Sequence, residues 1–371
     1  MDTRQIYAEI DARIGSTSAC DENALPRPLL NNLNKWNWGG YGWISPVSLM
    51  ITATWKKAYD HNADCCKIWS DDETGRPIAG AYSIRSLDET ITVPLFAKYD
   101  LCKDFCSPNS GMQGSRAIEK MRSEKRLNTS FASKQKTVFD LKLFAVILNQ
   151  INDLTIQDCF RLLDFFIVKA KSIKSKRDKQ NSMLTQAPAS HVNVIDLLSQ
   201  IHDPELTKCV TAGCLMAMCP TADFTVTGIS DYKTAADERA EKPGDLCVMS
   251  FKNPMMAVEV KDKSQTINWK NIERASTILG RFPTVVSFVF ILENRKALVS
   301  DRIREIVSSD LITHGAAKKI SIMSLHDLYT LARSFKDDAY ILEMTNNAMV
   351  RTPALKPDSR TKWISLIKSG C

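Results

Sequence analysis

The feature that most constrains the fold of this sequence is the nearly all-apolar run TVVSFVFIL at residues 284–292. A strand without polar alternation is buried on both faces, which is typical of a central position in a parallel or mixed sheet. The preceding residues 269–280 repeat apolar side chains at helical spacing. Together the two patterns predict a mixed α/β fold in which helices flank a central mixed sheet.

Other strands and helices are expected ahead of this pair. Three segments have the composition of short strands: FTVTGI at 224–229, DLCVMS at 245–250 and MAVEVK at 256–261. We expect a turn around Asn253 and Pro254 to fold the last two into a hairpin. Helical spacing predicts two helices before the strands, at 193–201 and 205–219.

The N-terminal half is dominated by helical spacing. Ser45 followed by Pro46 is a typical helix start and predicts a helix over 46–59. Apolar stripes predict two further helices, at 138–151 and 156–167. The segment ETITVPLF at 89–96 is a candidate for a short strand, which a proline interrupts.

A polar stretch without periodicity, QNSMLTQAPAS at 180–190, separates the two patterns. We therefore predict a mainly helical N-terminal domain at 1–180, a linker at 181–190 and an α/β domain at 191–371.

Hydropathy and cysteine usage indicate a cytoplasmic protein. No stretch approaches the roughly 20 apolar residues that cross a bilayer, and the first residues are polar and acidic, unlike a signal peptide. The 11 cysteines are odd in number and irregularly spaced. Small buried thiols in a reducing compartment explain them better than disulfides or metal ligands.

The formal net charge of +7 permits a polyanionic partner without requiring one, so the distribution of charge matters more. Residues 169–179 carry six Lys or Arg against Asp178, and residues 102–136 carry eight against three acids. Such runs are often the solvated end of a helix, and two of them in one chain also favour contact with phosphates.

The chemistry is concentrated in the predicted hairpin. Glu259 and Lys261 are two residues apart on one strand, so their side chains leave the same face of the sheet. Asp245 begins the other strand, and the hairpin brings it close to Glu259. Two carboxylates beside an ammonium favour a divalent cation, and oxygen ligands favour Mg²⁺. Lys261 can then hold or deprotonate an attacking water.

This segment resembles the PD-(D/E)XK nuclease superfamily, in which an Asp heads one hairpin strand and Glu-x-Lys lies on the next. The matching residues are Pro243-Gly244-Asp245 and Glu259-Val260-Lys261, and the helix and buried strand at 269–292 agree with its layout. The resemblance implies that Asp245 and Glu259 bind Mg²⁺, that Lys261 assists the water, and that 191–371 is the catalytic domain. Many members add an acid from the preceding helix, where the nearest candidate is Glu205.

The surrounding sequence is similar to that of type II restriction endonucleases, in particular the SacI-like enzymes. The segments concerned are ISDYKTAADERAEKPGDL, GAYSIRSLDETITVPL and SPNSGMQGSRAIEK. The resemblance implies cleavage of double-stranded DNA at a short, palindromic site, 5′-phosphate ends, and a methyltransferase encoded nearby. Cleavage of both strands also implies a homodimer.

The N-terminal domain would then recognise DNA. Long basic and amide side chains can read base edges in the major groove, and the candidates are Gln113, Arg116, Arg122, Lys125 and Arg126. Cations of the second basic run would contact phosphates, namely Lys171, Lys174, Lys176 and Arg177. An exposed amphipathic helix explains the first set equally well.

Two rival functions remain compatible with these residues. A repair or junction-resolving nuclease would share Asp245, Glu259 and Lys261. A non-catalytic DNA-binding protein would keep the basic segments, and the three residues would then be a surface ion pair and a turn residue of little energetic value.

Overall fold

The computed structural model describes residues 3–36, 38, 47–67, 75–101, 127, 129, 140–186, 192–219, 221, 223–230, 243–261, 267–293, 310–313, 316–352 and 355–369. The chain divides into two compact units, Met1–Asp178 and Lys179–Cys371. One long helix, α9 (Ile156–Thr185), runs from the first unit into the second.

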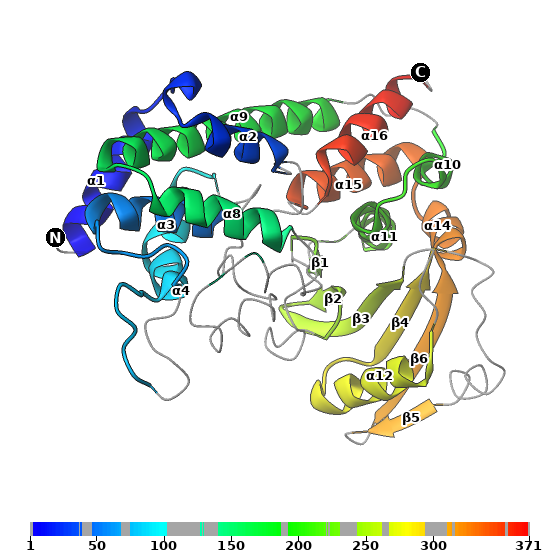
Figure 1. Ribbon diagram of the computed structural model, residues 1–371. Coiled ribbons are helices and arrows are strands. Elements are labelled where there is room, and N and C mark those ends of the chain that lie inside the picture. Colours follow the sequence, from blue (N-terminus) through cyan, green and yellow to red (C-terminus); the bar gives the residue numbers. More distant parts are fainter. Residues whose placement is uncertain are drawn as a thin grey trace. The chain divides into compact units, whose positions relative to one another are not determined.

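The described part of the first unit is built from helices (Figure 1). Its other elements are α1 (Thr3–Ser16), η1 (Glu22–Ala24), α2 (Arg27–Lys35), α3 (Val47–Tyr59), α4 (Ile84–Leu87), the π-helical turn η2 (Asp88–Thr92), α5 (Val93–Lys98) and α8 (Leu141–Asn152). Helices α3, α8 and α9 confirm the helical segments expected at 46–59, 138–151 and 156–167.

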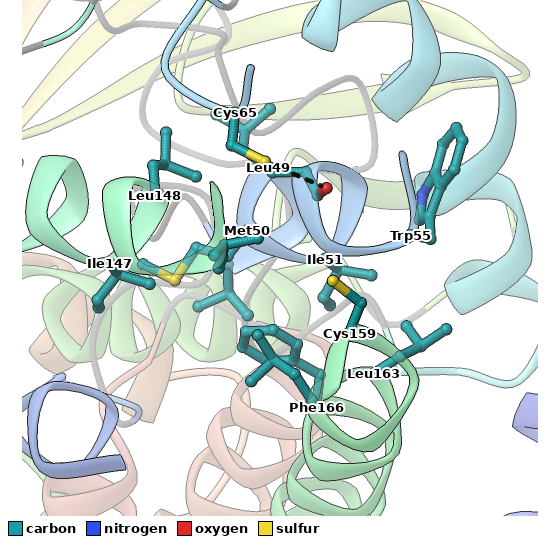
Figure 2. Packing of buried hydrophobic residues seen from close by; sticks show 14 of the residues in the cluster. Leu49, Met50, Ile51, Trp55, Cys65, Ile147, Leu148, Cys159, Leu163 and Phe166 are labelled. Carbon is teal, nitrogen blue, oxygen red and sulfur yellow. Dashed lines mark hydrogen bonds between the residues drawn. The ribbon is translucent and has the colours of Figure 1, made fainter. Parts of the chain in front are cut away.

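The core of this unit forms where α3, α8 and α9 meet. Figure 2 shows Leu49 and Ile51 of α3 among Ile147 of α8 and Leu163 and Phe166 of α9, all buried. Side chains all around α3 are buried, since it is the central helix of the cluster. A helix that is buried on all sides is typical of the interior of such a core.

The strand expected at 89–96 is wrong. These residues form η2 and α5, and Pro94 lies in the first turn of α5, where a missing N–H is tolerated. Ile91, Leu95 and Phe96 are buried in the helical core. Burial of one helical face outweighs the weak strand preference of the β-branched residues in this segment.

The second unit is a mixed α/β fold with one six-stranded sheet, in the order β1-β2-β3-β4-β6-β5. Its strands are β1 (Phe224–Thr227), β2 (Leu246–Ser250), β3 (Asn253–Lys261), β4 (Ser287–Leu292), β5 (Asp310–Thr313) and β6 (Ala316–Ser324). Its helices are α10 (Val194–Ser199), α11 (Pro204–Met218), α12 (Trp269–Arg281), α14 (Leu325–Arg333), α15 (Asp338–Arg351) and α16 (Pro357–Ser369).

Strand β4 holds the central place expected of the apolar run. It pairs in parallel with β3 on one side and with β6 on the other, whereas β2 is antiparallel to both of its neighbours, β1 and β3. Val289 and Ile291 face the helices α11, α14 and α15, and Phe288 and Phe290 face α12. Helices therefore cover both faces of the sheet, as Figure 1 shows for α11 and α12.

The hairpin of β2 and β3 is present, but its turn differs from the prediction. Ser250 pairs with Asn253, so the turn residues are Phe251 and Lys252, and both have positive φ. Pro254 belongs to β3 and lies beside a register shift in the pairing with β2. The sheet tolerates this proline because the ladder is irregular there.

The predicted linker is also partly wrong. Helix α9 continues to Thr185, so residues 181–185 are helical, and residues 187–191 lie outside the described part of the chain. Leu184 is buried in the core of the second unit, which explains why a polar-looking segment stays helical.

Within the described residues, no helix has both the length and the apolar character needed to span a membrane.

Candidate active site

Asp245 lies immediately before β2, where the chain passes close to β3. A Cβ atom at Gly244 would come within 2.8 Å of the Val258 carbonyl oxygen, so glycine is needed for this approach. The approach lets Oδ2 of Asp245 accept a hydrogen bond of 2.9 Å from the backbone N–H of Val260. The Gly-Asp pair of the sequence motif thus has a structural reason.

Glu259 and Lys261 lie on β3 and share a face, as their spacing predicted. Ala257, two residues earlier, packs on the α12 side of the sheet, whereas Val258 packs on the other. The Lys261 Nζ atom donates a hydrogen bond of 2.7 Å to Oε1 of Glu259. Since the Lys261 side chain is only 13% exposed, the pair is largely withdrawn from solvent.

The Glu259 carboxylate is electrostatically costly. The residue is 6% exposed, and its Oε2 atom is buried without a hydrogen-bond partner among the described residues. Burial raises the pKa of Glu259, the nearby charge of Asp245 raises it further, and Lys261 opposes both effects. A buried carboxylate with one oxygen unmatched is suited to receive a cation.

A second cation, Arg274 of α12, was missed by sequence reasoning. Its Nη1 atom lies 3.6 Å from Oε1 of Glu259, and its side chain is 45% exposed. The sequence indicated only that Arg274 lies on the polar face of the helix that follows the motif strand. Its proximity to Glu259 depends on how α12 packs against the sheet.

Two further acids lie near the ends of the elements that form this site. Glu293 follows β4; its N–H donates to the Lys261 carbonyl, and its Oε2 accepts the Thr207 hydroxyl at 2.7 Å. Sequence reasoning missed it. Glu205 is fully buried in the first turn of α11, and its role as an additional acid of the site remains a prediction.

Most of the α9 side chains that were predicted to contact phosphates bind other residues of the first unit. Lys171 donates to the carbonyls of Ile14 and Thr17. Lys174 and the buried Arg177 both pair with Asp100. Lys176 is exposed. Lys171, Lys174 and Arg177 thus have partners within the protein. Their role in DNA binding remains a prediction.

The predicted base-reading residues are Gln113, Arg116, Arg122, Lys125 and Arg126, and all five lie outside the described residues.

The pair Asp245 and Glu259 fits a hard divalent cation. Within the described part of the chain, no group of three or more His, Cys, Asp or Glu side chains could hold a metal ion. Two carboxylates are nevertheless a sufficient protein contribution for Mg²⁺, which retains several waters and accepts phosphate oxygens. The unmatched Oε2 of Glu259 is the observation that favours such an ion.

No protein-family model matches the chain, and no curated protein sequence matches it. The interpretation of this site therefore depends on its geometry and on the resemblance of its motif.

Proposed function

We propose that this chain is a Mg²⁺-dependent nuclease that hydrolyses phosphodiester bonds in double-stranded DNA. The observation that carries the proposal is the buried Glu259 carboxylate, whose Oε2 atom is unmatched while Oε1 is held by Lys261. Asp245 stands beside it and raises its pKa, as two carboxylates that share one cation would.

Each of these side chains has a distinct task in the proposed reaction. Asp245 and Glu259 would hold Mg²⁺, which when bound supplies polarisation of the phosphate and a lower pKa for the attacking water. Lys261 is oriented by its 2.7 Å bond to Glu259. Its ammonium can donate to the water or to a phosphoryl oxygen and so stabilise the negative charge that develops there.

The order of elements supports the nuclease proposal. Helix α11 is followed by three antiparallel strands, then by α12, and then by β4, which is parallel to β3. The motif residues lie at one end of β2 and β3, as the resemblance to the PD-(D/E)XK superfamily implies. The finer proposal, a homodimeric type II restriction endonuclease, depends on the sequence resemblance alone.

Incubation of purified protein with plasmid DNA, in Mg²⁺ and in a chelator, tests the proposed function. We expect metal-dependent cleavage into discrete fragments. A smear would indicate a different nuclease, and absence of cleavage with DNA binding retained would indicate a binding protein.

Substitution of the motif lysine tests the site. We expect Lys261→Ala to reduce cleavage by roughly a hundred-fold or more while DNA binding is retained, because the ammonium acts on the reacting atoms. Lys252→Ala, in the turn of the same hairpin, is the matched control and should cleave like the wild type. Retained cleavage by Lys261→Ala would refute the site assignment.

A further inference from the structure

We infer that Lys261 is the counter-ion of Glu259 in the metal-free protein and competes with the metal ion for that carboxylate, an inference that rests on the proposed nuclease function. Metal binding would then release Lys261 from its ion pair. The contacts of Asp245, Glu259 and Lys261 lead to this inference.

The two carboxylates of the site are held by different kinds of donor. Oδ2 of Asp245 accepts the neutral backbone N–H of Val260 at 2.9 Å. Oε1 of Glu259 accepts the Lys261 ammonium at 2.7 Å, whereas Arg274 lies 3.6 Å from the same oxygen. Oε2 of Glu259 is buried without a hydrogen-bond partner among the described residues. The buried Glu259 therefore depends on a nearby cation, and Lys261 is hydrogen-bonded to it.

Lys318 shows how this unit holds a buried lysine that has a structural role. It is 1% exposed, and its Nζ atom donates to three backbone carbonyls around the C-terminus of α12. Each proton of its ammonium group can thus have a backbone acceptor. Lys261, by contrast, has Glu259 as its one hydrogen-bond acceptor among the described residues. Loss of this single ion pair is enough to release it.

A divalent ion at Glu259 would lie close to the Lys261 ammonium. Like charges a few ångströms apart repel each other, and this repulsion is poorly screened where side chains are withdrawn from water. Glu259 is 6% exposed and the Lys261 side chain is 13% exposed, so the site is of this kind. The ion with two charges gains more from the carboxylate, and the lysine moves because its four-carbon stem is flexible.

Release of Lys261 has a use in the proposed reaction. In the metal-free protein its ammonium is bonded to Glu259. An ammonium that has left this carboxylate can donate to a water or to a phosphoryl oxygen. The motif lysine would therefore become available when the site is loaded with metal.

Mg²⁺ titration of the DNA-free protein tests this competition, with calorimetry at about pH 8 to keep carboxylates ionised. Lys261→Met keeps a stem of similar length and removes the charge. We expect this variant to bind Mg²⁺ about three- to thirty-fold more tightly than the wild type, because the repelling ammonium is gone. Lys252→Met makes the same change in net charge in the exposed turn of the hairpin, and its affinity should stay within about two-fold of the wild type.

Melting temperature is a second measurement of the same competition. In a chelator, Lys261→Met should melt below the wild type, because Glu259 loses its hydrogen-bonded counter-ion. Saturating Mg²⁺ should raise the melting temperature of the variant by more than that of the wild type, because the ion replaces the missing charge. Lys261→Gln removes the charge but keeps an amide donor, and it replaces Lys261→Met in both measurements if that variant does not fold.

Two results would overturn the inference. If Lys261→Met binds Mg²⁺ with the affinity of the wild type or more weakly, Lys261 does not compete with the metal and instead orients Glu259 for it. If Lys261→Met and Lys252→Met tighten Mg²⁺ binding equally, net charge alone explains the change.

Failure of the proposed function gives a different result. If the wild type binds no Mg²⁺, the metal-dependent nuclease and this inference fail together. If it binds Mg²⁺ without cleaving DNA, the nuclease proposal fails, and the affinities of the variants still decide the inference. If it cleaves DNA and Lys261→Met binds Mg²⁺ no more tightly than the wild type, only the inference fails.

Discussion

At the scale of single residues, Glu259 shows how burial prepares a side chain for chemistry. A carboxylate that loses water must recover the lost interactions from partners, and Lys261 supplies them to Oε1 alone. Burial therefore raises the pKa of Glu259, and the charge of Asp245 acts in the same direction. We therefore expect the buried Glu259 carboxylate to destabilise the protein when no metal is bound.

This cost predicts how stability changes with pH. Because the pKa of Glu259 is raised in the folded state, the folded protein keeps a proton that the unfolded chain has already released. The contribution of this group to the free energy of unfolding therefore falls as the pH rises from 4.5, the ordinary pKa of a glutamate, to the raised pKa of Glu259 in the folded protein. In a chelator at about pH 8, Glu259→Gln should be more stable than the wild type by about 1 kcal/mol.

Thermal or urea unfolding at several pH values measures this difference. The advantage of Glu259→Gln should vanish at acidic pH, and Mg²⁺ should stabilise the wild type but not the variant. Glu273→Gln, an exposed glutamate of α12, is the control and should follow the wild type. A Glu259→Gln variant that is less stable than the wild type in chelator at neutral pH would contradict this account.

At the scale of elements, the pairing register of the β2–β3 hairpin places unfavourable residues in its turn. Asn253 and Pro254 are better turn residues than Phe251 and Lys252, yet the latter two form the turn. The reason is that Leu246 and Val258 must face the same core, and this pairing fixes which residues are left to connect the strands. The turn consequently has left-handed backbone at two residues with bulky side chains, φ 46° at Phe251 and 73° at Lys252.

The turn predicts a stabilising substitution. Lys252→Gly should raise the free energy of unfolding by about 0.5 to 1 kcal/mol, because glycine adopts positive φ without the steric cost that a Cβ atom imposes. Lys252→Ala removes the same side chain but keeps the Cβ atom, so it should not stabilise. Urea unfolding compares the two variants, and equal stabilities would show that the backbone of this turn is not strained.

At the scale of the whole molecule, the boundary between the units lies within a helix. The second unit begins at Lys179, and the last turns of α9 contribute to it. Leu184 is 1% exposed in its core, and Asn181 accepts a hydrogen bond of 2.7 Å from the buried Arg360. A cut at the predicted linker would therefore remove part of the core of the α/β domain.

Fragments that begin on either side of this segment test the boundary. We expect fragment 179–371 to be more stable than fragment 191–371, because loss of the buried Leu184 alone costs about 1.5 to 3 kcal/mol. Soluble yield and melting temperature measure the difference. Leu184→Ala in the longer fragment should reproduce part of the loss, and equal melting temperatures of the two fragments would contradict the assignment.

Much of the second unit could be predicted from local sequence patterns. The period of apolar residues identifies α12 and β4, and a spacing of two places Glu259 and Lys261 on one face. These features follow from backbone geometry, which repeats along the chain whatever its surroundings. The close approach of Gly244 to Val258 was not predicted, because it depends on how the two strands pair.

Other features were decided only by tertiary structure. The helical state of 89–96, the end of α9, the turn at Phe251 and the position of Arg274 beside Glu259 all depend on contacts between residues distant in sequence. Local preference differs by about 1 kcal/mol per residue between alternatives, which burial of a few apolar side chains exceeds. The sequence by itself therefore determined the motif and its elements, and packing decided where those elements end and which charges surround Glu259.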